Sequence, residues 1–376
     1  MASSEKSFKA SHGRRLFTRR RVLVATCLVA ATMAALWLLV GPGRDAGARL
    51  AAIDAAHAVP EERNAAKEYT QFILDGTWTL FDPYYLPQNA QTPTLAGPWR
   101  STDFPEVAKW IQGNQVAMDT LLKAGRKPQC WFPLYDPQGL SGTRWAVARC
   151  GTLLLLRAAN NDLAEGRTQA GLEKLLCVFQ TAGHYRVQMS QWDHLAGVRV
   201  GATGLKYLDR LLVMEDLPPE WLARFEAVLP PVADVTDKDL RQLHRIEDLR
   251  MRAYGGLHDR VKQTYMDMRF GTAQRVRQET AAHVAESRAT RILLALRRHK
   301  DRTGAWPVTL AEIEGQVPPE ALIDPVTGKP FVYRPPGDSL LLYTVGPNGT
   351  DEGGESGDDY RLWPPSKGRL RIDMEW

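Results

Sequence analysis

A run of nineteen uncharged residues, 22–40, follows directly after Arg19, Arg20 and Arg21. Hydrocarbon offers no water to backbone N–H and C=O groups, so an apolar run of this length is most stable in a bilayer as a helix. At about 1.5 Å per residue, such a helix covers nearly all of the ~30 Å hydrocarbon core. The run therefore predicts one N-terminal transmembrane helix, and this anchor determines which compartment the rest of the chain occupies.

Basic residues are concentrated ahead of the anchor. Residues 1–21 contain seven lysines and arginines and one acidic residue. The positive charge of this segment therefore exceeds the net charge of +5 of the whole 376-residue chain. Positively charged flanks stay in the cytoplasm. We therefore expect a protein of the inner (cytoplasmic) membrane with a cytoplasmic tail at 1–21 and a periplasmic or extracellular part at 44–376. The exported part is nearly neutral, which argues against a nucleic-acid partner.

Two other interpretations of the N-terminus stay open. The small residues Ala46, Gly47 and Ala48 could form the cleavage site of a secretory signal, although such a signal has an apolar core of only about 7–15 residues. Arg14 and Arg15 resemble a twin-arginine export signal. The length of the apolar run favours a retained anchor over both.

Cys130, Cys150 and Cys177 lie in the exported part. Three cysteines in an oxidising compartment indicate either one disulfide and one free thiol or three buried thiols. If a pair forms, we expect Cys130–Cys150, because Cys130 lies in a loop that must pack near the following helix.

Residues 44–288 predict a domain of stacked helical hairpins. Apolar residues recur at helical spacing, the joints are short, and residues 153–156 are four leucines, as in a central helix that is apolar all round. Prolines and aromatic residues at 75–103 exclude a long helix there and predict a coil packed on the helices or, alternatively, a binding rim. The basic stretch 237–302 predicts a solvated face or a contact with anionic lipid or cell-wall polymer. Predicted helices are 46–58, 64–74, 104–123, 143–163, 168–187, 192–214, one from 217–220 onward, and most of 237–302.

Residues 289–376 predict a small α+β module. A helix should stop at Gly304, and two short strands are expected at 331–334 and 340–345. The segment 324–330 forms a turn, Gly353, Gly354 and Glu355 follow the strands, and Asp359 stands four residues before Trp363.

These features resemble the C-terminal β-region of type II secretion major pseudopilins. The resemblance implies a calcium-binding loop, and acidic, glycine-rich loops can supply the oxygens that calcium takes. A solvated acidic loop without metal is the alternative. The resemblance stops at the N-terminus, where Gly13 is followed by arginines and no acid enters the apolar run, so prepilin processing is not expected. The implied metal ligands are Thr344, Asn348 and Asp359, with Asp351 and Asp358 nearby.

The whole arrangement of anchor, helical domain and pseudopilin-like end also resembles a group of uncharacterised membrane-anchored proteins of planctomycete type. That resemblance implies no activity.

Catalytic motifs are missing from the sequence: H-E-x-x-H, C-x-x-C, G-x-S-x-G and phosphate-loop patterns do not occur. Two weaker groupings of candidate site residues are present. Glu279, His283 and Glu286 share one predicted helix face, as metal ligands can. His184, Asp193 and His194 lie at the ends of neighbouring predicted helices.

Together these features predict a single-pass membrane protein whose exported domain is a scaffold or interaction surface, with the bilayer and other envelope proteins as partners. The alternatives are a component of a type II secretion or pilus-like apparatus, and an envelope hydrolase built around His184, Asp193 and His194. The sequence does not identify a reaction or a ligand.

Overall fold

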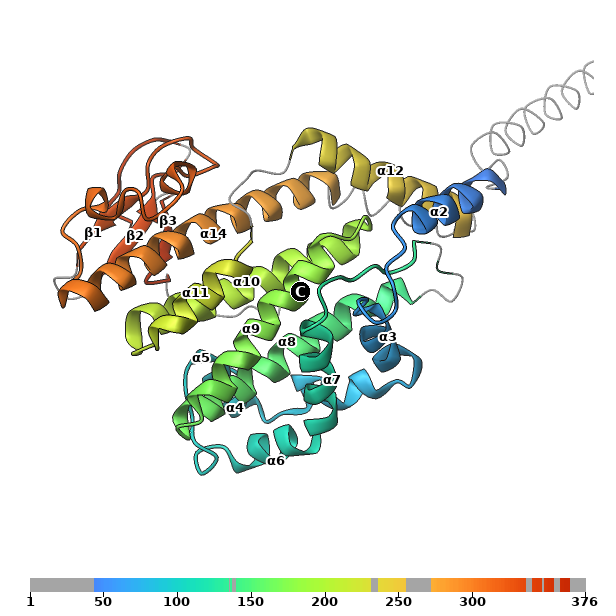
Figure 1. Ribbon diagram of the computed structural model, residues 1–376, viewed down its shortest axis with the longest axis horizontal. Helices are drawn as coiled ribbons and strands as arrows, with labels where there is room; N and C mark the ends of the chain where they lie inside the picture. The colour runs from blue at the N-terminus through green and yellow to red at the C-terminus, as the bar shows by residue number, and fades with distance from the viewer. Residues whose placement is uncertain are drawn as a thin grey trace, which may run out of the picture.

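The computed structural model describes residues 44–134, 136, 140–230, 236–254, 272–335, 340–346, 348–354 and 359–365. The predicted tail, 1–21, and anchor, 22–40, lie outside these ranges. Within the described part, no helix is both long and apolar enough to cross a membrane. The described chain is mainly helical and ends in a small antiparallel sheet (Figure 1), as the sequence predicts.

Short elements make up the first part of the chain. Its prolines limit the length of each helix, because a proline lacks the backbone N–H that continues one. In the proline- and aromatic-rich stretch, Phe81, Leu86 and Trp99 are buried, whereas Tyr84 and Tyr85 are exposed. Packing on the helices is therefore confirmed for only part of this stretch. The elements are α2 (Arg44–Ala56), α3 (Ala66–Leu74), η1 (Thr77–Phe81), η2 (Pro83–Tyr85), α4 (Gln88–Gln91) and α5 (Pro93–Ala96).

The predicted helix 104–123 is two helices, α6 (Pro105–Gly113) and α7 (Gln115–Gly125). Asn114 separates them with a non-helical backbone (φ −104°, ψ 18°). Its Nδ2 donates to the Trp110 carbonyl at 2.8 Å, which satisfies one of the carbonyls left free where α6 ends. The prediction of one continuous helix is wrong at this point.

Three long helices form the centre of the molecule: α8 (Ser141–Ala164), α9 (Thr168–Arg186) and α10 (Gln191–Met214). They pack as consecutive hairpins, and all four leucines 153–156 of α8 are buried, as predicted. Among the later helices, α14 and α12 pack against α10, and α11 packs against α9 and α14 (Figure 1). Their bounds are α11 (Pro219–Val228), α12 (Asp237–Tyr254) and α14 (Thr272–Thr303).

Glycines on α10 allow α9, α10 and α14 to meet at very short distances. A Cβ atom added to Gly197 would lie 2.3 Å from the backbone nitrogen of Arg186 on α9. One added to Gly201 would lie 2.6 Å from Cε1 of His283 on α14. Any larger residue would therefore overlap backbone on one side and a buried ring on the other. These two positions determine how closely the three helices pack.

The long helix α14 joins the helical core to the C-terminal module. Thr280 lies beside His194, and the Thr290 hydroxyl donates to Asp209 at 2.6 Å, so α14 runs in the same direction as α10. α14 is continuous through residue 288, where the sequence places the boundary between two domains. It ends at Gly304 (φ +82°), as predicted.

The sheet consists of β1 (Val332–Arg334), β2 (Leu341–Thr344) and β3 (Tyr360–Trp363), in the order β1-β2-β3 with antiparallel neighbours. The first two strands match the predicted segments, and β3 is an additional strand. In Figure 1 the sheet packs beside the C-terminal half of α14.

Cys130, Cys150 and Cys177 are buried free thiols. The Cys130–Cys150 pair is therefore not formed, and the alternative of three unpaired thiols is confirmed. Burial raises the pKa of Cys150 and of Cys177 to about 12, which keeps both thiols protonated and unreactive at neutral pH.

Gly197→Ala should destabilise the full chain by about 1–3 kcal/mol, because the new methyl group overlaps backbone atoms that cannot move aside. Gly183→Ala on α9 is the matched control, since nothing lies within 4 Å of its added Cβ. We expect this control to be neutral or to gain up to about 1 kcal/mol from helix propensity. Urea unfolding of the full chain in detergent measures both changes, and equal stabilities of the two variants would contradict the close helix contact.

Candidate functional site: a basic groove along α9

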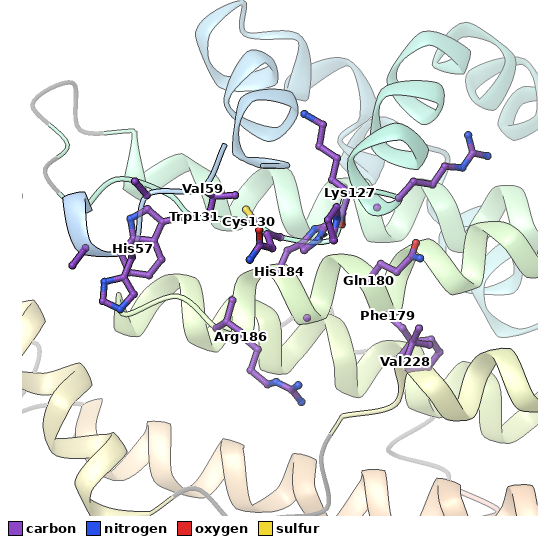
Figure 2. Close-up of a pocket in the computed structure, with 18 residues that line it drawn as sticks. His57, Val59, Lys127, Cys130, Trp131, Phe179, Gln180, His184, Arg186 and Val228 are labelled. Carbon is purple, nitrogen blue, oxygen red and sulfur yellow. Dashed lines mark hydrogen bonds between the residues drawn. The ribbon is translucent and has the colours of Figure 1, made fainter. Parts of the chain in front are cut away.

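A groove of about 810 Å³ runs along the exposed side of α9. One wall is the segment 125–131, and the floor is a stripe of α9 together with Val187 just after it. The floor residues are Phe179, Gln180, Gly183, Arg186 and Val187. Residues 56–59, after α2, close one end, and Val228 at the end of α11 lies at the other. Figure 2 shows these elements surrounding the groove.

Two side chains, His184 of α9 and Gln188 just after its C-terminal end, hold the wall of the groove in place. His184 Nε2 lies 2.9 Å from the Lys127 carbonyl oxygen, and Gln188 Nε2 donates to the Cys130 carbonyl at 2.8 Å. The Gln188 Oε1 atom accepts from the Phe132 N–H at 3.1 Å. Both side chains lie at the C-terminal end of α9, so together they align the extended segment 127–132 with this end of the helix. His184 thus has a structural role.

The hydrogen bonds around His184 define one tautomer. Its Nε2 can only donate to the Lys127 carbonyl, so its Nδ1 accepts from the Tyr69 hydroxyl at 3.1 Å. Burial lowers the pKa of His184, which keeps the ring neutral. A neutral ring with both nitrogens engaged has no capacity left for acid–base work.

A stacked pair of rings closes the α2 end of the groove. The rings of His57 and Trp131 are 4.6 Å apart and nearly parallel, at 11°. The Trp131 indole N–H donates to Asp54 of α2 at 3.1 Å, and the same carboxylate accepts from the Leu134 N–H at 2.8 Å. The groove therefore ends in an aromatic surface whose position α2 determines.

The charged side chains that line the groove are all basic among the described residues. Among the described residues that line it none is acidic, whereas Arg126, Lys127 and Arg186 all contribute. Lys127 is neutralised by Glu68, outside the groove, at 2.9 Å. Neither Arg126 nor Arg186 has a carboxylate partner among the described residues. Figure 2 shows the Lys127 and Arg186 side chains extending in opposite directions. Burial lowers the pKa of Arg186, and an arginine in this state gains from an anionic neighbour.

The predicted grouping of His184, Asp193 and His194 is not formed as a hydrogen-bonded set. His184 bonds Lys127 and Tyr69, and His194 Nδ1 lies 2.8 Å from the Arg186 carbonyl. Each ring is committed to a different part of the α9–α10 junction.

Asp193 belongs instead to a buried ionic cluster that the sequence does not suggest. Arg144 of α8 lies 3.2 Å from Asp193 and 3.5 Å from Asp136, and all three side chains are buried. Glu247 and Arg250 of α12, 3.2 Å apart, are also buried, and Arg250 donates to Ser190 at 2.8 Å. Burial raises the pKa of Asp193 and of Glu247, and the arginines oppose that shift. The cluster ties α12 to the α8–α10 core.

The predicted ligand face on α14 is also divided among different partners. Glu279 accepts two hydrogen bonds from Arg199, at 2.7 and 2.8 Å, and Tyr360 of β3 donates to Glu286 at 2.9 Å. His283 is buried against Gly201. Within the described residues, no three histidine, cysteine or acidic side chains form a group that could hold a metal.

The predicted calcium loop is closed by its own hydrogen bonds. The two Asp359 oxygens accept the N–H groups of Gly346, Glu352 and Gly354 at 3.3, 3.0 and 2.8 Å. The Thr344 hydroxyl donates to Asp324 at 2.6 Å. Asp358 lies outside the described residues. The set can offer oxygens to a calcium ion only by exchanging some of these contacts. The two remaining predicted ligands have loop partners as well: Asn348 donates to Glu352, and Asp351 accepts from Tyr343 and Gly353.

Comparisons of this chain with protein-family models, with curated proteins and with solved structures find no match.

His283 should make the protein sensitive to acid. Burial, followed by the nearby charges of Arg186 and His194, lowers the pKa of His283 from 6.5 to about 3. The ring stays neutral in the folded state while the unfolded chain takes up a proton, so the free energy of unfolding should fall as the pH falls from 6.5 to 3. One such proton contributes up to about 1.4 kcal/mol per pH unit.

Urea unfolding of the full chain between pH 7 and pH 4 measures this dependence. His283→Gln should give a shallower slope by one proton. Equal slopes for His283→Gln and the unaltered chain would contradict a buried neutral ring.

Proposed function

We propose that this protein is a membrane-anchored binding scaffold of the cell envelope, and that the groove along α9 holds an acidic, extended segment of a partner protein. One observation carries the proposal: the described lining contains arginines without carboxylate partners and no acidic side chain. An unpaired, partly buried guanidinium is stabilised when a ligand supplies the missing negative charge.

The dimensions of the groove suit a peptide. Its volume of about 810 Å³ lies toward the upper end of the range for small-molecule pockets. The floor from Phe179 to Val187 spans eight helical steps, or about 12 Å. An extended chain covers this length with about four residues. The apolar side chains Phe179, Val187 and Val228 provide contacts for alternate side chains of such a segment, and Arg126 and Arg186 provide contacts for its acids.

The envelope location follows from the anchor expected at residues 22–40. A basic tail before an apolar run supports a cytoplasmic N-terminus, and this orientation gives the exported domain access to other envelope proteins. The catalytic alternative has less support, because His184, Asp193 and His194 each bond to different groups.

Reversing the two unpaired charges should abolish binding of an acidic peptide. The probe is a fluorescein-labelled peptide of alternating glutamate and leucine, added to the full chain in detergent and followed by fluorescence anisotropy. Arg126→Glu together with Arg186→Glu should weaken binding by roughly tenfold or more. Arg245→Glu, an exposed arginine on α12, is the matched control and should change little.

Steric and topological controls complete this test. Gly183→Phe should block the groove floor, whereas Gly183→Ala should not. A peptide of alternating lysine and leucine should bind far more weakly, and equal binding of both peptides would contradict the proposal. In spheroplasts, a membrane-impermeant amine reagent should label the exposed Lys238 of α12, and labelling only after lysis would contradict the orientation.

A component of a type II secretion-like apparatus is a second candidate. The support is the three-stranded meander beside α14, together with the Asp359 carboxylate that gathers three backbone N–H groups of the preceding loop. In the pseudopilin family that the C-terminal sequence resembles, this loop binds calcium. We propose calcium as its ligand here as well.

Calcium removal tests this second candidate. The thermal midpoint of the full chain should be higher in millimolar calcium than in chelator, by mass action on the folded state, which reaches about 2.7 kcal/mol at a hundredfold excess over Kd. Asp359→Ala should lower the midpoint in both conditions and remove the difference between them. Identical midpoints for the unaltered chain would contradict a calcium loop.

A further inference from the structure

A second, smaller pocket of about 210 Å³ lies where α8, α10 and α14 meet. It shares no lining residue with the groove along α9. Two tryptophans and two arginines dominate its lining, and aliphatic side chains complete it. The lining residues are Trp145, Trp192, Leu195, Ala196, Arg199 and Arg275.

The tryptophans give the pocket flat apolar walls. Trp192 is 41% exposed although it lies on a long core helix, while Trp145 packs partly against the main core. Leu195 and Ala196 are buried beneath them. Exposed indole next to a concavity is typical of surfaces that bind ligands, because ring faces gain from stacking. A cavity of about 150 Å³ can hold benzene, so this pocket has room for one six-membered ring with a substituent.

The arginines are held in place by one acid. Arg199 bonds both oxygens of Glu279, at 2.7 and 2.8 Å, and Arg275 Nε donates to the same carboxylate at 2.6 Å. One carboxylate thus serves two guanidinium groups, which leaves a local excess of one positive charge. Burial acts to raise the pKa of Glu279, but the hydrogen bonds and charges of the two arginines together outweigh it and lower this pKa.

Hydrogen-bond donors outnumber acceptors in this pocket. The Glu279 oxygens already accept three N–H groups, while the remaining N–H groups of both guanidiniums are not used by Glu279. Neither indole N–H donates to another described residue. A ligand that fits must therefore bring acceptor oxygens, and a cationic ligand would be repelled.

We propose that this pocket binds a single six-membered ring that carries a carboxylate. The ring stacks on Trp192 and Trp145, and the carboxylate accepts hydrogen bonds from Arg275 and Arg199 in the planar geometry that guanidinium favours. Two sources share this chemistry: an aromatic acid and a uronic-acid sugar. The binding groups are the same in both cases.

Fluorine NMR of the full chain, labelled with 5-fluorotryptophan and kept in detergent, tests the proposal. Trp145→Phe and Trp192→Phe assign the two resonances. Benzoate and glucuronate are titrated separately, each beside its neutral analogue, benzyl alcohol or glucose. Saturable shifts of the Trp192 resonance with at least one acid, and far smaller shifts with its neutral analogue, are expected. A response to benzoate alone identifies an aromatic acid, and a response to glucuronate identifies a sugar.

Substitutions distinguish a built site from a general surface effect. Trp192→Ala, followed at the Trp145 resonance, and Arg275→Gln should each weaken binding by roughly tenfold. Tyr84→Ala, at an exposed aromatic residue elsewhere, should change nothing, and thermal midpoints verify that each variant is folded. The absence of a shift with both acids, equal binding of the neutral analogues, or unchanged binding by Trp192→Ala and Arg275→Gln would each overturn the proposal.

Discussion

The contact between α9, α10 and α14 at Gly197 and Gly201 is the constraint on which the other features depend. Because neither glycine has a side chain, the backbone of α9 lies directly on α10, and the ring of His283 fills the space over Gly201. Next to this contact, Gln180, Gly183 and Arg186 of α9 line the floor of the groove. The same packing sets the position of the start of α14, and so of Arg275 and Glu279 beside Trp192. Both candidate sites therefore derive their geometry from one small-residue contact.

Buried ion pairs are the second feature that fixes the positions of the helices. Arg144 and Asp193 pair inside the protein, and Glu247 with Arg250 connects α12 to the same region. Breaking a buried pair leaves an uncompensated charge, so such pairs tolerate little displacement of the helices that carry them. α12 in turn packs against α2, and Asp54 of α2 orients Trp131 at the end of the groove. The groove thus depends on charges well outside its lining.

Local patterns in the sequence predict the helices well, and long-range partners explain what they miss. The boundaries of α8, α9 and α10 agree with prediction to within two residues, because apolar spacing and short joints are local signals. The break at Asn114 has a local signal too, a Gly-Asn pair typical of helix ends, which the apolar spacing on both sides conceals. β3 forms by pairing with β2, a long-range contact. The charged residues around β3 make its alternation of apolar and polar residues hard to recognise in the sequence.

The candidate sites were less predictable than the fold. Histidine and acid at neighbouring helix ends suggest a shared site, yet Tyr69, Lys127 and Arg144 from distant parts of the chain take those side chains as separate partners. Nothing in the pattern around Arg186 or Arg275 separates them from the many solvated arginines nearby. The useful signal would have been a tryptophan next to a helix start, because the Trp192 ring is 41% exposed.

The packing of the His283 ring on Gly201 affects the order in which the helices can fold during synthesis. Helices α8 to α10 are contiguous in the chain, so they can associate while synthesis continues. The His283 ring that packs over Gly201 belongs to α14, which is synthesised much later. Until α14 emerges, the flank of α10 that carries Gly201 stays uncovered. The carboxy-terminal third therefore completes the fold. A chain that ends before it would leave that flank of α10 exposed to association with apolar surfaces.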